Sequence, residues 1–396
     1  MKKRIVVIGG SFGGLTAAFE VKRLMREKAD VILISSDKDF VFMPSLPWII
    51  MGSRRPTDIT LSVADILKPK GIRFIHDTVK EVKPDELKVL TPKDEYEYDY
   101  LIISTGPLLS CDEIPGLSPE EGYTNCTFSM EQALKSREAW NRLLEAPGPI
   151  VLGSTQMASC FGPYYELAFE MDQELRKRKM RHKVPITYLT SEPYLGHMGV
   201  GGLGKSRRFM EDEFAALDIQ TVTSQSIDEI TPEEIRLAGG GKLPFKLAML
   251  APPFKGVQGV ASLGNPRGFI PADNYYRHPK HSNIYTIGVA MALAPPEPTP
   301  VPTGVPKTGF MTVKMAKAAA ANIAADMQHL SPSREKELGV ICFMDMGRTA
   351  ALMVAEPVLP PRQKSYLKKA WWVKTAKIQF EKYFLWKMRH GYSQLP

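Results

Sequence analysis

The N-terminal segment is the feature that most restricts what this chain can fold into. The run "RIVVIGGSFGGLTAAFEVKRL" begins as an apolar strand, turns at Gly9, Gly13 and Gly14, and continues into a helix that opens with small residues. Glycines in such a turn let the backbone approach a pyrophosphate, whose charge is met by the N-terminus of the helix. The segment therefore predicts a Rossmann-like nucleotide-binding unit at the start of an α/β chain.

Two positions depart from the usual dinucleotide-binding fingerprint. Ser11 stands where the middle glycine is expected, and Ser35, with Asp37 nearby, stands where an acidic residue usually follows the second strand. A tight structural turn is the alternative that this motif alone leaves open.

Length and composition set the broad class. The chain has 396 residues, of which 44% are apolar, enough for two or three packed domains. It contains no long apolar run, and its N-terminus enters the first strand directly, so we expect neither a spanning helix nor a signal peptide. Four cysteines are too few for a disulfide scaffold, so any bridge is expected to be catalytic.

The net charge of +8 is concentrated in the C-terminal tail. Nine Lys and Arg and a single acid, Glu381, follow residue 361, which leaves equal numbers of basic and acidic residues in the rest of the chain. This distribution argues against a nucleic-acid partner and predicts one basic patch with an anionic partner.

The same tail is rich in aromatic residues. Its sequence "KKAWWVKTAKIQFEKYFLWKMRHGY" places Trp372, Ala376 and Phe380 on one helical stripe and Trp371 and Ile378 on another, with lysines between them. Such a segment suits an anionic lipid interface, with the rings at headgroup level. The alternative is a helix that packs its apolar face on the protein body or on a second subunit.

A second glycine turn lies at residues 151–166, "VLGSTQMASCFGPYYE". A nicotinamide site needs further glycines after Gly153, but Thr155 and Met157 stand there, and their side chains block the approach of a pyrophosphate. We therefore expect that this domain no longer binds NAD(P)H. A ribose-binding role for Glu192 is the alternative.

Two later segments are similar to parts of flavin reductases. Residues 98–107, "YDYLIISTGP", resemble the strand and turn that re-enter the nucleotide domain, and residues 283–290, "NIYTIGVA", resemble the strand that meets the flavin ribityl chain. That strand usually ends Gly-Asp, whereas this one ends Gly-Val. A Pro-rich stretch follows, and a helix beginning at Lys307 or Thr308 would direct its positive end toward the flavin. An ordinary linker and core helix is the alternative.

Taken together, the motifs resemble the sulfide:quinone oxidoreductases, which belong to the flavoproteins with two dinucleotide-binding domains. Segments such as "IGGSFGGLTAAFE", "FVFMPSLPWIIMG", "GYTNCTFSMEQA", "ASCFGPYYELAFE", "GHMGVGGLG", "ICFMDMG" and "FEKYFLWK" occur in the family's order. The resemblance implies an α/β fold with two tandem Rossmann-like domains of FAD/NAD type and a C-terminal amphipathic, membrane-binding helical region. We place the FAD-binding domain at 1–110 and 250–340, the second Rossmann-like domain at 111–249, and the quinone and membrane region at 341–396.

The resemblance also implies the activity: oxidation of sulfide to polysulfide or sulfur through a cysteine pair and FAD, with electrons passed to a membrane quinone. Hydrosulfide attacks a disulfide sulfur and leaves a persulfide on one cysteine, here assigned to Cys160, while the other, Cys342, leaves as a thiolate. Cys126 matches a third family cysteine whose role varies. Cys111 matches none and is predicted to be inert. Without Cys342 as a partner, Cys160 would be interpreted as a buried structural thiol, because free cysteine packs like a small apolar side chain.

Further site residues are carried over from the same resemblance. Glu166 matches a glutamate thought to move protons, and His197 matches a family histidine; a solvated carboxylate and a backbone-bonded loop histidine are the respective alternatives. No metal is expected. The residues predicted to bind FAD are Gly9, Gly10, Ser11, Gly13, Gly14, Ser35, Pro44, Thr105, Gly106, Gly288, Lys307, Thr308 and Gly309. Those predicted to bind the quinone are Ile341, Lys382, Tyr383 and Phe384.

Three other functions compete with this prediction. A type II NADH:quinone oxidoreductase would share the fold, FAD and the tail. A flavocytochrome c flavin subunit would need a cytochrome partner and no lipid-binding tail. A membrane-associated, flavin-binding redox sensor would use the cysteines only as a switch. We expect a peripheral, monotopic membrane protein that forms a homo-oligomer on one membrane plane.

Overall fold

The apolar run near the N-terminus forms the central strand of a parallel sheet in the computed structural model, which describes residues 2–395. The sheet has five strands in the order β19-β9-β1-β2-β5, namely β19 (Ile284–Thr286), β9 (Tyr100–Ile103), β1 (Lys3–Ile8), β2 (Ala29–Ser35) and β5 (Arg73–His76). All the pairings are parallel. Because β19 comes late in the chain, the first domain is completed only after a long insertion.

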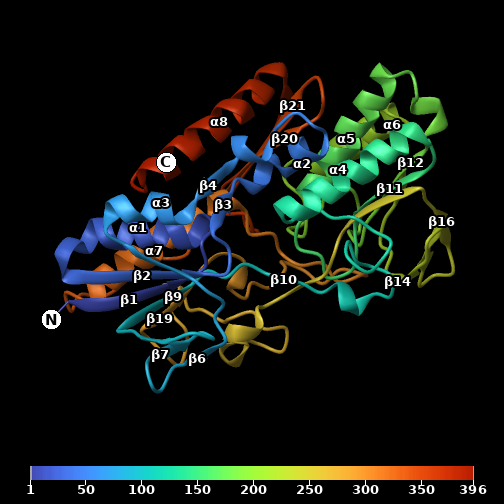
Figure 1. The fold of residues 1–396 in the computed structure, drawn as a ribbon. Coiled ribbons are helices and arrows are strands. Elements are labelled where there is room, and N and C mark those ends of the chain that lie inside the picture. The colour runs from blue at the N-terminus through green and yellow to red at the C-terminus, as the bar shows by residue number, and fades with distance from the viewer. Residues whose placement is uncertain (1, 396) are drawn as a thin grey trace.

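Two helices from distant parts of the chain pack together beside this sheet. They are α1 (Phe12–Met25) and α7 (Gly309–Asp326), which make one of the most extensive contacts between elements in the molecule. Ala316, Ala319 and Ala320 of α7 are fully buried, and small side chains of this kind allow close helix packing. Figure 1 shows α7 beside α1, near β1 and β2.

The insertion forms a second parallel sheet, in the order β13-β12-β11-β17. Its strands are β13 (Gln220–Val222), β12 (Ile186–Leu189), β11 (Ile150–Ser154) and β17 (Leu247–Ala251). Every residue of β11 and β17 is buried, as expected for strands covered on both faces. The strand β17 crosses the position where we placed the boundary between the second domain and the returning FAD domain. The accompanying helices are α4 (Met130–Glu145), α5 (Gly162–Lys177) and α6 (Ser206–Ala216).

The two chain crossings between these sheets lie side by side. They pair as a short antiparallel ribbon of β10 (Leu108–Leu109) and β18 (Phe254–Lys255). The remaining short elements are the hairpin β3 (Asp39–Val41) and β4 (Thr60–Ser62), the helices α2 (Leu46–Ile50) and α3 (Val63–Leu67), and the meanders β6 (Glu81–Lys83), β7 (Lys88–Leu90), β8 (Glu95–Glu97) and β14 (Ile227–Ile230), β15 (Glu234–Leu237), β16 (Lys242–Pro244).

The C-terminal region is a three-stranded antiparallel sheet with one long helix. The strands are β20 (Val340–Asp345), β21 (Ala350–Glu356) and β22 (Lys364–Ala370), and the helix is α8 (Trp371–His390). In Figure 1, α8 (red) runs along one side of the molecule, and it contacts the three strands and α3. Among the described residues, none of the helices combines the length and apolar character needed to cross a bilayer.

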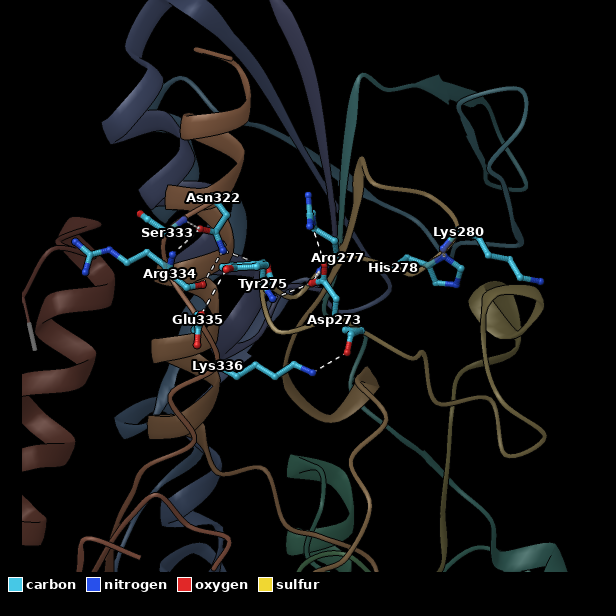
Figure 2. A network of polar contacts seen from close by, with 11 residues as sticks. Asp273, Tyr275, Arg277, His278, Lys280, Asn322, Ser333, Arg334, Glu335 and Lys336 are labelled. Atoms are coloured by element: carbon cyan, nitrogen blue, oxygen red, sulfur yellow. Dashed lines mark hydrogen bonds and ion pairs between the residues drawn. The ribbon is translucent and has the colours of Figure 1, made fainter. Parts of the chain in front are cut away.

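The irregular segment that leads into β20 is held by a polar network around Asn322 of α7 (Figure 2). The buried Asn322 amide donates to the carbonyl oxygens of Tyr275 (3.1 Å) and Arg334 (2.8 Å), and its oxygen accepts from the backbone N–H of Arg334 (2.9 Å). Lys336 adds a hydrogen bond to the carbonyl of Ala272 (2.6 Å). These bonds fix the path of the chain to β20, the strand that carries Cys342.

Candidate active site

The first glycine turn has the geometry of a phosphate cradle. Gly9 has a φ of +110°, and a Cβ at this position would collide with the carbonyl oxygen of Ser104. A Cβ at Gly14 would collide in turn with the carbonyl oxygen of Gly9, so both positions require glycine. The Ser11 side chain makes no capping hydrogen bond to α1, which leaves the first N–H groups of this helix available to an anion. These residues fit a pyrophosphate.

The N-terminus of α7 lies against the same turn. A Cβ at Gly309 would lie 2.9 Å from the ring of Phe12, the first residue of α1, and the methyl group of Thr312 would meet a Cβ at Gly13 or Gly288. Thr308 caps α7, because its hydroxyl accepts from the N–H of Met311 (3.3 Å). Two helix N-termini therefore converge where β1 and β19 end. This is where a dinucleotide binds in α/β sheets.

The other predicted FAD-binding residues lie around this turn or near it in sequence. A Cβ at Gly10 would lie 2.8 Å from the Ser35 hydroxyl oxygen at the end of β2. Thr105 and Gly106 follow β9, and Lys307 directly precedes the cap of α7. Lys307 places its ammonium 5.2 Å from the ring centroid of Phe269, and burial lowers its pKa to about 8. Pro44 lies in the short turn Met43–Ser45 before α2, and its contact with FAD stays a prediction.

The second glycine turn is occupied by the protein itself. Thr155 donates through its hydroxyl to the carbonyl of Ala251 (3.0 Å), and the N–H of Met157 donates to the carbonyl of Pro302 (2.7 Å). Gly304 donates from its N–H to the carbonyl of Ala158 (2.8 Å). The Pro-rich segment thus lies across the turn and engages the Met157 N–H, a donor that a nicotinamide pyrophosphate could otherwise use. This gives a structural reason for the predicted loss of NAD(P)H.

Glu192 is engaged within the second domain. Its fully buried carboxylate accepts hydrogen bonds from the hydroxyls of Tyr165 (2.9 Å) and Thr190 (2.9 Å) and from the N–H of Met198 (2.6 Å). Burial raises the pKa of Glu192 to about 7, although these three bonds act to lower it. Its oxygens are therefore not free to bind a ribose.

Cys160 and Cys342 are distant in sequence, but the elements that carry them, the start of α5 and β20, pack against each other. Cys160 precedes α5 and Cys342 lies on β20; both are half-buried, free thiols. Burial raises the pKa of Cys160 to about 12, and the charge of Cys342 adds to this effect. Burial raises the pKa of Cys342 to about 11 against the opposing charge of Lys377. The structure thus brings together the two predicted redox cysteines.

A buried ion pair lies beside Cys342. Glu166 of α5 accepts from the ammonium group of Lys377 on α8, and its second oxygen accepts from the N–H of Asp345 (3.1 Å). This N–H is available because β20 is the edge strand of its sheet. Glu166 and Lys377 are both buried, so the alternative of a solvated helix carboxylate at Glu166 is wrong.

Further charged groups surround this pair. Asp345 forms an ion pair with Lys374 (3.1 Å) and accepts from the indole N–H of Trp48 (3.0 Å). Glu170, one turn after Glu166, is also buried. Burial and the negative charges of Glu166 and Asp345 raise the pKa of Glu170 well above its usual range. The cluster combines two lysines and three acidic side chains.

The sequence interpretation did not identify Lys377 as a site residue. It treated the tail lysines as groups directed toward lipid headgroups, but Lys377 lies on the buried side of α8 with Val373, Phe384 and Met388. The helical spacing of these four residues was the available signal. A lysine on an apolar stripe needs a buried partner, and Glu166 provides it.

The remaining predicted catalytic residues lie in the second domain or beside it. Cys126 is buried, and its carbonyl accepts from the hydroxyl of Ser136 (2.9 Å). His197 is fully buried; its Nδ1 accepts from the N–H of Gly199 (3.2 Å), and burial lowers its pKa. The backbone-bonded alternative therefore describes the geometry of His197, while its catalytic role stays a prediction.

The predicted quinone residues fall into two groups. Ile341 is 39% exposed, Lys382 is exposed, and the Tyr383 ring stacks on Trp386 with centroids 6.2 Å apart. Phe384 is only 3% exposed, and its ring packs against three phenylalanines of the FAD-domain side. Phe384 therefore faces the protein rather than lipid.

Exposed apolar side chains lie on the C-terminal sheet and at the start of α8. Ile341 pairs with Val354 and Val354 pairs with Tyr366, so the three lie on one face of the sheet. Trp371, 74% exposed, and Trp372, 39% exposed, begin α8 at the end of β22. We call Ile341, Tyr366, Trp371 and Trp372 the outer apolar patch.

Known proteins are similar to this chain in sequence and in fold. Residues 3–320 match the pyridine nucleotide-disulphide oxidoreductase family. The sulfide-quinone reductase of Aquifex aeolicus is 39% identical over 401 residues, which cover 99% of this chain and 92% of that protein. An X-ray structure of the sulfide:quinone oxidoreductase from the same organism superimposes with a TM-score of 0.93 and covers 98% of this chain and 92% of that chain.

More distant relatives extend the comparison. A mitochondrial sulfide:quinone oxidoreductase of Dictyostelium discoideum is 27% identical, over 72% of this chain and 64% of that protein. The NDH2 of Plasmodium falciparum, solved in complex with NADH, has a TM-score of 0.72 at 16% identity and covers 99% of this chain and 97% of that chain, which is a likeness of fold alone. Because the family match spans most of the chain and the 39% identical relative aligns over nearly all of it, the chain belongs to the pyridine nucleotide-disulphide oxidoreductases and, within them, to the sulfide:quinone oxidoreductases.

Proposed function

We propose that this protein oxidises sulfide through the pair Cys160 and Cys342 and delivers the electrons, by way of FAD, to a membrane quinone. The observation that carries the proposal is the packing of α5, which directly follows Cys160, against β20, which carries Cys342, beside the buried pair of Glu166 and Lys377. The family membership supports the reaction, and the side chains named here give it a structural route.

FAD, the cofactor of this family, accepts two electrons from sulfur and passes them to quinone. The role of the protein is to bind FAD. The turn at Gly9 and Gly14 presents the N-terminus of α1 to the pyrophosphate, and the N-terminus of α7 offers positive potential at the same edge of the sheet.

The cysteines supply the sulfur chemistry. In the oxidised enzyme, hydrosulfide attacks the sulfur of Cys160 in a disulfide with Cys342; the new sulfur–sulfur bond leaves a persulfide on Cys160, and the old bond breaks to release Cys342 as a thiolate. Lys377 stabilises this thiolate, because its positive charge lowers the pKa of Cys342. Glu166, paired with Lys377, accepts the persulfide proton in the next step.

The quinone is proposed to bind on the other side of β20. Neighbouring residues of a strand point to opposite faces, so Ile341 faces outward while Cys342 faces the protein body. The half-buried Phe380 packs its ring against Phe343, with centroids 5.8 Å apart, and lies closer to this side of the strand than the enclosed Phe384. Phe380 therefore joins Ile341, Lys382 and Tyr383 as a candidate quinone contact.

Membrane association and self-association belong to the same proposal. The outer apolar patch supplies rings at one end of α8, and the exposed lysines Lys368 and Lys382 lie near them in sequence. Lys368 places its ammonium 5.6 Å from the ring centroid of Trp372. This combination suits an anionic headgroup layer, on which several copies of the chain would bind in one orientation.

Anaerobic sulfide titration followed by flavin absorbance tests the activity. Sulfide should bleach the flavin of the wild type, whereas Cys160→Ser and Cys342→Ser should keep FAD and lose bleaching, since neither thiol belongs to the phosphate cradle. Cys111→Ser is the matched control and should behave as the wild type. Bleaching by NADH but not by sulfide would contradict the proposal.

A further inference from the structure

The segment "FVFMPSLPWIIMG", residues 40–52, joins the FAD domain to the C-terminal region. Phe42 packs its ring against that of Phe380 on α8, with centroids 6.1 Å apart. Ser45 donates from its hydroxyl to the carboxylate of Glu381, a buried residue of the same helix. The segment therefore contacts α8 both through aromatic packing and through a hydrogen bond to a buried acid.

Trp48, on α2 within this segment, lies among charged groups where α2, β20 and α8 meet (Figure 1). Its indole N–H donates to the carboxylate of Asp345 (3.0 Å). The ammonium group of Lys377 lies over its ring, 4.5 Å from the centroid, and the guanidinium carbon of Arg54 lies 4.4 Å from the centroid. The side chain is only 3% exposed, so the indole makes these contacts away from solvent.

Each cation over the indole has its own buried carboxylate. Lys377 donates to Glu166, and Arg54 donates to Glu381 (2.9 Å). Both carboxylates belong to buried side chains. A cation over an aromatic ring is attracted by the quadrupole of the ring, and the attraction is stronger where water is excluded. The indole is therefore a contact shared by two ion pairs whose acids are buried.

Several acidic groups compete for the ammonium group of Lys377. Charge alone acts in all directions and does not select one partner among them, whereas a cation–π contact and a hydrogen bond are directional. Trp48 supplies one of each: the face of its ring holds the ammonium group, and its N–H engages an acid. The ionisable groups around Lys377 are Glu166 and Glu170 of α5, Asp345 and the Cys342 thiol of β20, Lys374 and Glu381 of α8, and Arg54 after α2.

We propose that Trp48 is a positioning residue, which holds the ammonium group of Lys377 against Glu166 and engages the competing carboxylate of Asp345. A fixed ammonium group gives Glu166 a constant counter-charge, and Glu166 is the proposed acceptor of the persulfide proton. The effect on proton transfer therefore rests on the proposed function, whereas the contact itself does not. An indole suits this position better than a phenyl ring, because it adds an N–H donor to the aromatic face.

A thermodynamic cycle tests the contact without the use of sulfide. Trp48→Leu is introduced into the wild type and into a double variant, Glu166→Gln with Lys377→Leu, and urea unfolding of the FAD-saturated proteins is compared. Leucine at position 377 avoids the favourable sulfur–aromatic contact that methionine would make. The contacts of Trp48 with Asp345 and Arg54 are common to both backgrounds and cancel.

The expected result is a larger effect of Trp48→Leu in the wild type. The factor by which this change raises the unfolding equilibrium constant should be about twofold to thirtyfold greater there than in the double variant, the range for a cation–π contact. Trp140→Leu is the matched control, because Trp140 on α4 is also 3% exposed and α4 packs against α2, but none of the described cations lies over its ring. Its factor should be equal in the two backgrounds.

The second measurement is the pH dependence of flavin bleaching under anaerobic conditions, with sulfide saturating at every pH. Trp48→Leu loosens Lys377 from Glu166, so the carboxylate loses part of the positive charge that favours its ionised form. The acid limb of the profile should therefore move to higher pH by up to about one unit, a tenfold change in the ionisation equilibrium. Trp140→Leu should leave the acid limb in place.

Equal factors for Trp48→Leu in the two backgrounds would overturn the proposal. If a leucine variant does not bind FAD, Trp48→Phe and Trp140→Phe replace the pair, and the difference between backgrounds should again be larger for Trp48. An unchanged acid limb would overturn the effect on proton transfer. Absence of bleaching in the wild type would instead refute the sulfide activity, while the thermodynamic cycle would still decide the contact, so the two failures are distinguishable.

Discussion

Removing the charge of Lys377 should destabilise the protein strongly. The change Lys377→Met keeps a long apolar side chain on the buried side of α8 but leaves Glu166 without its counter-charge. Glu166 would retain only the N–H of Asp345 as a donor among its described partners. Breaking a buried ion pair from one side costs about 3–5 kcal/mol, because the remaining charge is buried and uncompensated.

The double variant separates this effect from lost packing. Replacing both charges, as in Glu166→Gln with Lys377→Met, removes the uncompensated carboxylate, so most of the lost stability should return. Urea unfolding of FAD-saturated protein at pH 7 gives the free energies for the four members of the cycle. Lys382→Met, on the exposed side of the same helix, is the matched stability control and should change the free energy by less than about 0.5 kcal/mol.

A chemical readout tests the link to Cys342. Lys377 lowers the pKa of this thiol, so Lys377→Met should raise that pKa further and slow alkylation of Cys342 at any pH below it. Mass spectrometry after timed alkylation of the reduced protein follows Cys342 alone. A single variant that loses less than about 1 kcal/mol, or a double variant as unstable as the single one, would refute the ion-pair argument.

Three further outcomes are expected. Since burial raises the folded-state pKa of Glu192 to about 7, the free energy of unfolding should fall as pH rises from about 4.5 through 7. Glu192→Gln should abolish this fall and increase the free energy of urea unfolding at pH 8 by up to about 3 kcal/mol. An equally large increase at pH 5 would contradict the argument. Glu170→Gln should preserve stability at pH 7 within about 1 kcal/mol, because burial and the neighbouring negative charges raise the pKa of Glu170 and favour its neutral form; a larger loss would show that it is ionised. The double variant Trp371→Ala with Trp372→Ala should bind anionic liposomes about tenfold or more weakly, while sulfide should still bleach the flavin. Unchanged sedimentation with the liposomes would exclude the outer apolar patch as the membrane contact.

Local sequence features were sufficient to predict the glycine turn of the first domain. The glycines of the N-terminal turn are dictated by contacts within the turn itself, such as the approach of Gly14 to the carbonyl of Gly9. Because such requirements act between residues close in sequence, they can be recognised from the sequence alone. The second turn was interpretable for the same reason, since Thr155 and Met157 stand where a pyrophosphate would need bare backbone.

Partnerships between distant segments were harder to predict. Lys377 meets Glu166 only because α8 folds back over β20 and α5, and nothing near either residue in the sequence specifies the other. The tail also contributes side chains both to the exposed surface and to the buried core. Its tryptophans Trp371 and Trp372 are exposed, but Phe384 is part of the core, and a helical stripe alone does not distinguish a lipid-facing side from a protein-facing one.

The two-sided nature of α8 changes how its role can be tested. Deleting the whole tail would remove Lys377 and the buried side of α8 together with the exposed rings, so membrane binding, stability and the setting of Cys342 would all change at once. Substitution of the exposed tryptophans alters only the outer side.

The strand β20 lies between the proposed sites of sulfide oxidation and quinone reduction. Successive side chains of a strand point in opposite directions, so Ile341 and Cys342 lie on opposite faces although they are adjacent in sequence. On the inner face Cys342 is influenced by the charge of Lys377 and acts in turn on Cys160, while on the outer face Ile341 continues the row of Val354 and Tyr366. A helix would place adjacent residues only about 100° apart, which would bring quinone and sulfur species to neighbouring positions. A strand backed by a helix therefore suits an enzyme that must keep its soluble substrate and its lipid-soluble substrate apart.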